Sequence, residues 1–203
     1  MLLWYTRGSP YADKARIAVH ELGLVDRVSL IESQDDGRAS GRTWSQMPVL
    51  VPYNEEPIFD LGEIIAFLNH EAGGGLYPRD PAAYYRAIAM DMVADRAIKA
   101  AVVLAEAEAD PGQPRDRLGL NRLWLSINVS LDILERDRFA GAPCASEFSA
   151  AALCRFLAAH WPERFSATRQ SHVAGWYAAF ACRPSMTALT AAAGMRGRPP
   201  SEG

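Results

Sequence analysis

The amino-acid sequence predicts a mixed α/β first part followed by an all-helical second part. Residues 2–23 have the pattern of a short apolar strand, a polar turn and a helix. Beyond the glycines at 73–75, every apolar run has helical spacing. These consecutive glycines, with the prolines that follow them, are typical of a linker.

We therefore expect a first domain at residues 1–76, a linker at 77–81 and a helical domain at 82–193. The chain has 203 residues, of which 49% are apolar types, and this length allows two small domains with cores of their own. The last stretch, 194–203, is rich in glycine and proline, and we expect it to be disordered.

The first helix is predicted to begin at Pro10, because the missing N–H of proline would have no partner at that position. Ser9 before it is a typical cap residue, and Gly23 ends the helix. Its apolar face is formed by Ala15, Ala18, Val19 and Leu22. Arg16 is expected to face solvent or a neighbouring carboxylate. The Ser9 hydroxyl then lies at the positive end of a helix dipole, where an anion is favoured.

Three more strands and one more helix complete the first domain. Apolar runs predict strands at 28–31, 47–51 and 58–59. The proline in the second of these runs must lie at a strand start or on an edge, because it cannot donate to a ladder. Asp60 precedes an apolar stripe of helical spacing, and Glu63 three residues later resembles a capping box.

Four helices are predicted in the second domain. An alanine-rich helix at 82–108 ends at a proline-containing interruption. An amphipathic helix follows at 120–134, and a third, almost wholly apolar, at 149–161. We expect the third to be central to the bundle, with its first residue, Ser149, as its cap. A fourth helix is predicted at 173–180.

Composition and charge exclude several classes of function. The net charge of -3, without a basic patch interleaved with aromatic residues, argues against a nucleic-acid partner. We see no signal peptide and no apolar run of about 18 residues, so we expect a cytoplasmic protein without a membrane span. Cys144, Cys154 and Cys182 lack metal-ligand spacing, so we interpret them as buried thiols and expect no metal.

Five segments in order resemble the cytosolic glutathione transferases, and the resemblance covers nearly the whole chain. They are Ser9-Pro10-Tyr11, MPVLV at 47–51, IFDLGEIIAFLN at 58–69, GGGLYPRDP at 73–81, and the helix with RPSM that ends at Met186. The resemblance implies the glutathione transferase fold, an α/β thioredoxin-like N-terminal domain plus an all-α C-terminal domain, in a homodimer. Similar sequences are common among bacterial transferases whose active residue is a serine.

The resemblance also implies an enzyme that activates the thiolate of glutathione for attack on an apolar electrophile, as in detoxification. The family's serine falls on Ser9, and Tyr5 is a second hydroxyl near it. Lowering a thiol pKa from about 8.5 to about 6.5 requires roughly 2.7 kcal/mol. A hydrogen bond to a charged group supplies about 1.5–3 kcal/mol, so one hydroxyl at a helix start is sufficient. Arg7, in the turn, is placed to meet an anionic ligand.

By the same resemblance, the glutathione backbone pairs with Met47, which precedes the family's cis-proline at Pro48. Gln46 is expected at the glycyl end. The γ-glutamyl pocket falls on Asp60 and Leu61, where the family has an acidic residue and a serine. Leu61 removes one hydrogen-bond donor, at a cost of about 1.5–3 kcal/mol, or roughly ten- to a hundredfold in affinity.

The electrophile pocket is expected near Tyr5, Tyr11, Asp91 and Asp95. Simpler interpretations stand beside these assignments: the serine and the aspartate at the two helix starts as caps only, and the paired aspartates as a solvated helix face. A second function therefore stays open. It is a binding or structural role on the same fold with weak or no glutathione activity, and Leu61 favours it.

Overall fold

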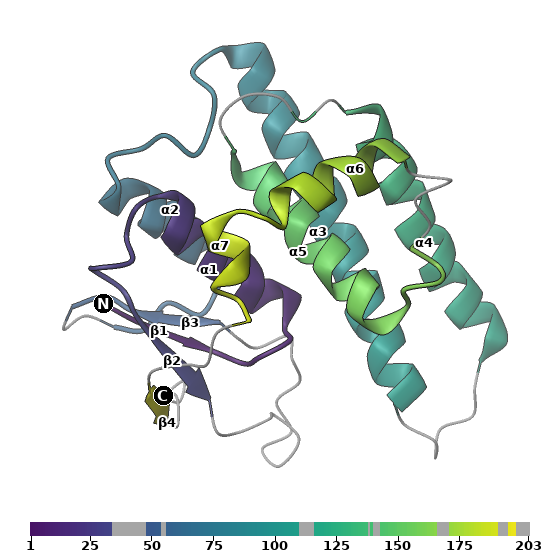
Figure 1. Ribbon diagram of the computed structural model, residues 1–203, viewed down its shortest axis with the longest axis horizontal. Helices are drawn as coiled ribbons and strands as arrows, with labels where there is room; N and C mark the ends of the chain where they lie inside the picture. Colours follow the sequence, from purple (N-terminus) through teal and green to yellow (C-terminus); the bar gives the residue numbers. More distant parts are fainter. Residues whose placement is uncertain are drawn as a thin grey trace. The chain divides into compact units, whose positions relative to one another are not determined.

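The computed structural model describes residues 1–33, 48–53, 56–109, 116–137, 139, 143–165 and 171–190, and the backbone of 195–197. The chain divides into two compact units (Figure 1). Unit 1 contains Met1–Leu76 and the segment from Arg183 onward, and unit 2 contains Tyr77–Cys182. The residues after Cys182, expected in the helical domain, thus group with the first unit. The predicted succession of an α/β part and a helical part is confirmed.

The sheet of unit 1 has the strand order β3-β1-β2-β4. β1 (Leu2–Tyr5) pairs in parallel with β2 (Ser29–Ser33) and antiparallel with β3 (Val49–Val51). Leu3 and Tyr5 are the buried residues of β1, on the same side of the strand. This alternation explains why so short a strand holds its register.

The two edges of the sheet differ from the prediction. The strand expected at 58–59 is a single antiparallel bridge between Ile58 and Leu50. At the other edge, β4 (Met195–Gly197) pairs in parallel with β2. The expectation of a disordered C-terminus is therefore wrong at these residues, because the exposed edge of a strand offers backbone partners that no local pattern reveals.

The described helices of unit 1 are α1 (Pro10–Glu21), α2 (Leu61–Glu71) and α7 (Pro184–Thr187). α1 contacts both α2 and α7. The first two begin where the sequence predicts, because Ser9 and Asp60 accept hydrogen bonds from their first turns.

Unit 2 consists of helices in the described residues: α3 (Pro81–Ala109), α4 (Arg117–Arg136), α5 (Ala145–His160) and α6 (Ser171–Phe180). α3 packs against α4 and α5, and α6 contacts both α4 and α5. α5 is buried over most of its length, as its apolar composition predicts.

The start of α5 differs from the prediction. Its N-cap is Cys144 rather than Ser149, and the backbone N–H of Cys144 donates to Glu147 at 2.9 Å. This contact fixes the first turn in the manner of a capping box. Ser149 instead lies inside the helix, 0% exposed, and its hydroxyl donates to the carboxylate of Asp91 at 2.5 Å.

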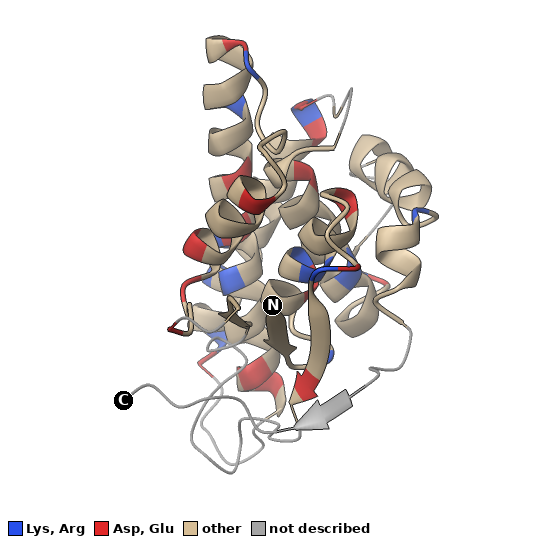
Figure 2. Cartoon of the chain, turned by 90° about the vertical axis from the view of Figure 1, so that its left-hand side faces the viewer, with Lys and Arg blue, Asp and Glu red and all other residues tan. Residues whose placement is uncertain are grey.

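Acidic and basic residues are interspersed along the helices of the described chain (Figure 2). Among the described helices, none combines the length and the apolar character that crossing a membrane requires.

Candidate functional site

The turn between β1 and α1 places Ser9 at the first turn of the helix. Gly8 has φ +82°, a conformation that favours glycine, and Ser9 N–H donates to Thr6 O at 3.3 Å. The Ser9 hydroxyl accepts from Ala12 N–H at 3.4 Å, and the residue is 0% exposed. Its role as a cap is therefore confirmed. A hydroxyl that accepts at its oxygen still carries one O–H donor, so capping and donation to an anion are compatible.

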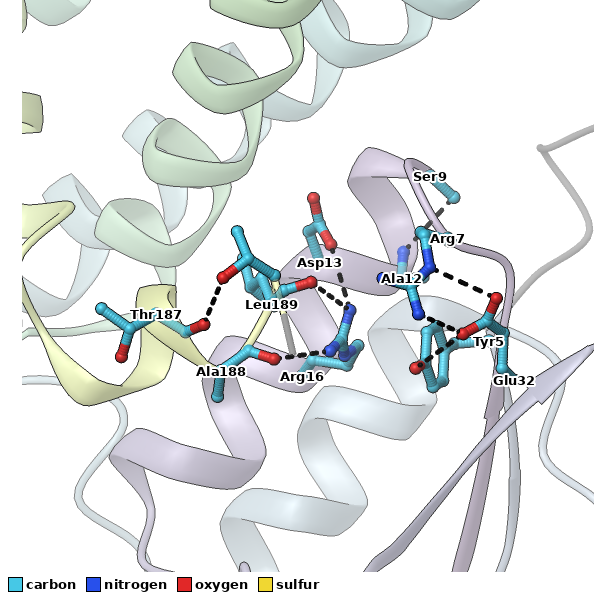
Figure 3. A network of polar contacts seen from close by, with 11 residues as sticks. Tyr5, Arg7, Ser9, Ala12, Asp13, Arg16, Glu32, Thr187, Ala188 and Leu189 are labelled. Atoms are coloured by element: carbon cyan, nitrogen blue, oxygen red, sulfur yellow. Dashed lines mark hydrogen bonds and ion pairs between the residues drawn. The ribbon is translucent and has the colours of Figure 1, made fainter. Parts of the chain in front are cut away.

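Tyr5, the second candidate hydroxyl, is turned toward Glu32 on β2 (Figure 3). Its O–H donates to Glu32 at 3.5 Å, and the side chain is 1% exposed. Burial is the main reason that the pKa of Tyr5 is raised, so its hydroxyl stays protonated at neutral pH. Glu32 also accepts from Arg7, at 3.3 Å from Nε and 2.5 Å from Nη2.

Arg16 is a buried charged residue of α1. Its guanidinium lies over the ring of Tyr5 at 4.2 Å and donates to Ala188 O at 2.9 Å and Leu189 O at 3.4 Å. It also lies 3.7 Å from Asp13. Of the two expectations for Arg16, a position that faces solvent is wrong and a neighbouring carboxylate, that of Asp13, is confirmed. The guanidinium is buried because the carbonyls at the end of α7 need donors from outside their own helix. Sequence reasoning missed this role, and no local signal marks it.

A second set of polar contacts joins the start of α7 to the C-terminal end of α1. Glu21 accepts from Arg183 at 2.8 and 2.6 Å, and from the hydroxyl of Ser185 at 2.5 Å. Burial raises the pKa of Glu21, but the hydrogen bonds from Arg183 and Ser185 outweigh it, so the pKa is lowered. Together with Arg16, these contacts fix the helix that carries Ser9.

The start of α2 holds the next two candidates. Asp60 is exposed and its side chain accepts from Glu63 N–H at 3.0 Å, so its role as a cap is confirmed. Leu61, half-buried, is the first residue of the helix. Pro48 is buried immediately before β3. Gln46 and Met47 lie outside the described residues.

The remaining candidates are divided between the units. Tyr11 is half-buried on α1 of unit 1, whereas Asp91 and Asp95 are half-buried on α3 of unit 2. Burial, followed by the charge of Asp91, raises the pKa of Tyr77 to about 12. Because Asp91 accepts from Ser149, the interpretation as a solvated face does not hold for it. The described residues contain no cluster of ligands suited to a metal ion.

Comparison with known proteins gives three findings. Residues 8–71 match the family profile "Glutathione S-transferase, N-terminal domain". The uncharacterized GST-like protein YibF of Escherichia coli (strain K12) is 30% identical over 132 residues, 63% of this chain and 64% of the relative. A glutathione transferase family member from Pseudomonas fluorescens Pf-5, with bound S-(propanoic acid)-glutathione, has 26% identity and a TM-score of 0.78. That match covers 100% of this chain and 98% of that one.

A fourth similarity concerns the fold alone. The glutathione S-transferase from Methylobacillus flagellatus KT, with glutathione bound, has a TM-score of 0.80 at 20% identity. This match covers 93% of the present chain and 98% of that chain.

Proposed function

Residues 8–71 match the N-terminal domain of the glutathione S-transferases, and on that premise we propose that the chain is a glutathione transferase that binds glutathione, stabilises the thiolate and directs it at an electrophile. The observation that carries the proposal is the hydroxyl of Ser9 at the start of α1. Structural neighbours from Pseudomonas fluorescens Pf-5 contain glutathione or its S-(propanoic acid) conjugate, which supports glutathione as the co-substrate.

In this proposal Ser9 donates its O–H to the sulfur, while the N-terminal end of α1 adds favourable electrostatics. A hydrogen bond to a charged group contributes about 1.5–3 kcal/mol, and a helix N-terminus about 0.3–1 kcal/mol. Because Ser9 is 0% exposed, the thiolate reaches it only after the atoms that cover it move aside.

The rest of the tripeptide is assigned to the residues that the family resemblance indicates. Met47, before Pro48, pairs with the cysteinyl backbone, and Gln46 meets the glycyl end. Asp60 and the backbone N–H groups at the start of α2 meet the γ-glutamyl end. Leu61 supplies no side-chain donor there, so we expect weak binding of glutathione.

The experiment that tests this function is an ultraviolet titration of the glutathione thiolate bound to the enzyme. Ser9→Ala should raise the thiol pKa by about one to two units, because it removes a hydrogen bond to a charged group. Ser171→Ala is the matched control, since that serine is exposed at the start of α6. An unchanged pKa in Ser9→Ala would contradict the role of Ser9 and direct attention to Tyr5.

A second variant tests the placement of the γ-glutamyl group. Leu61→Ser restores a donor at the first position of α2 and should lower the dissociation constant of glutathione roughly tenfold or more. Calorimetry measures the change. An unaltered constant would show that the group binds elsewhere.

The second candidate function is a binding or structural role with little glutathione activity. Its supporting observation is Leu61, a half-buried apolar side chain where a donor is expected. A glutathione-affinity resin separates the two candidates. Retention that free glutathione reverses supports the enzyme, and passage without retention supports the binding protein.

We also propose that the protein assembles as a cytoplasmic homodimer. Exposed apolar side chains recur along α3 at intervals of seven and eleven residues and along α4 at intervals of seven and four residues, so each set lies on one face of its helix. These side chains are Tyr85, Met92 and Val103 on α3, and Leu118, Leu125 and Val129 on α4. Sedimentation at several protein concentrations tests the assembly.

A further inference from the structure

Arg7 is held in the turn that leads to Ser9, and the proposed thiolate chemistry does not use it. The guanidinium donates through Nε and Nη2 to the two carboxylate oxygens of Glu32. Glu32 is in turn contacted by the hydroxyl of Tyr5. Figure 3 shows Arg7 beside the first turn of α1, between Ser9 and Glu32. This arginine is therefore oriented by its neighbours although its side chain is exposed.

The contact with Glu32 uses only part of the hydrogen-bonding capacity of Arg7. A guanidinium carries five N–H donors, and Glu32 engages its Nε and Nη2 atoms. Its side chain is 42% exposed, and within the described part of the chain it has no other hydrogen-bond partner. A planar group with unused donors is suited to bind a carboxylate.

We propose that Arg7 is a specificity-determining residue that receives the carboxylate of an anionic electrophile. This inference rests on the proposed function, because it presupposes a glutathione thiolate at Ser9. In that function the backbone N–H groups at the start of α2 take the γ-glutamyl carboxylate of glutathione, and Gln46 takes the carboxylate at the glycyl end. The electrophile is therefore the remaining source of a carboxylate near Arg7.

Electrostatics give the physical reason for such a residue. A thiolate repels an approaching carboxylate, and the repulsion is strong where water is partly excluded. A cation fixed near the sulfur offsets this repulsion for a charged electrophile and gives a neutral one little advantage. Glu32 acts as a positioning residue, because it holds the guanidinium in one orientation.

Iodoacetate and iodoacetamide are suitable probes, since they have nearly the same size and differ in charge. In both reactions the thiol proton passes to solvent, the thiolate sulfur forms a bond to the methylene carbon, and iodide leaves with the electron pair of the C–I bond. The quantity measured is the ratio of kcat/KM for the two probes, after subtraction of the uncatalysed reaction.

Arg7→Gln should lower kcat/KM for iodoacetate about tenfold or more and change that for iodoacetamide less than about twofold. Arg7→Lys, which keeps a charge, should retain part of the preference. Arg27→Gln is the matched control, because Arg27 also pairs with a glutamate, Glu71, and its side chain is 44% exposed. The ratio of kcat/KM for the two probes should be the same in Arg27→Gln as in the wild type.

Other outcomes overturn the inference. An equal fall with both probes would mean that Arg7 only maintains the turn. Weaker binding of glutathione with an unchanged ratio of the two kcat/KM values would mean that Arg7 binds glutathione itself. If the wild type turns over neither probe, the proposed function fails and the inference fails with it. If it turns over iodoacetamide and shows no preference that depends on Arg7, only the inference fails.

Discussion

Helix α1 of unit 1 and helix α5 of unit 2 are both buried over most of their length, but they are fixed by different contacts. α1 buries charged side chains, among them Asp13 and Arg16, and the guanidinium of Arg16 bonds to carbonyls more than 170 residues away in sequence. Beyond its first turn, α5 buries mainly alanine, leucine and phenylalanine. One polar side-chain contact of its buried face joins Ser149 to Asp91.

This difference in contacts predicts how the stability of each unit responds to substitution. A buried charge that loses its partners costs several kcal/mol, whereas apolar packing is lost gradually as volume is removed. We therefore expect unit 1 to depend on a few polar residues, and unit 2 to depend on the total packing of its helices.

The largest effect is expected for Arg16→Leu. This change leaves the carbonyls of Ala188 and Leu189 without their donors and removes the group stacked on Tyr5, so the free energy of unfolding should fall by about 3–5 kcal/mol. Denaturant titration measures the loss. Arg164→Leu is the matched control, because Arg164 lies over Trp124 at 4.7 Å but is exposed, and it should cost about 0.5–1 kcal/mol.

A smaller effect is expected for Ser149→Ala in unit 2. The change removes a donor from the half-buried carboxylate of Asp91, so we expect a loss of about 1–3 kcal/mol in the free energy of unfolding. Ser130→Ala is the control, since the Ser130 hydroxyl is buried and has no hydrogen-bond partner among the described residues. It should be neutral or stabilising, and a loss equal to that of Ser149→Ala would show that the bond to Asp91 contributes nothing specific.

The smallest effect is expected at Glu21, and it depends on pH. Because the folded-state pKa of Glu21 lies below its ordinary value of 4.5, the ionised form stabilises the fold above that pH, and this contribution disappears as the pH falls through the folded-state pKa. Melting temperatures of wild type and Glu21→Gln should therefore differ at neutral pH and converge in acid. A constant difference across the range would exclude ionisation of Glu21 as the cause.

The parts of the fold that sequence predicts are those with local signals. Ser9-Pro10 and Asp60 mark the starts of α1 and α2, because a cap and its first turn lie within four residues. The sequence predicts the start of α5 too late, because Cys144 is an unusual cap and Ser149 is of a type commonly found at caps. β4 pairs with β2 from the other end of the chain, so no window of sequence around 195–197 contains its partner.

The same distinction applies to the candidate site. The position of Ser9 follows from its own helix, and that of Leu61 from the cap before it. The contacts of Arg16 and Glu32 could not be read from sequence, because their partners lie on other elements. The roles of Ser9 and Leu61 toward glutathione remain predictions, and so do those of Gln46 and Met47.

The placement of β4 and α7 in unit 1 has a consequence for biosynthesis. The amino group of Met1 donates to Arg27 O at 3.0 Å, and β4 pairs with β2, so residues from both ends of the chain belong to unit 1 and all of unit 2 is inserted between them. A ribosome therefore releases every residue of unit 2 before the last strand of unit 1 exists. Domains generally fold in order from the N-terminus during synthesis. In this chain, unit 2 is the first unit whose residues are all available for folding.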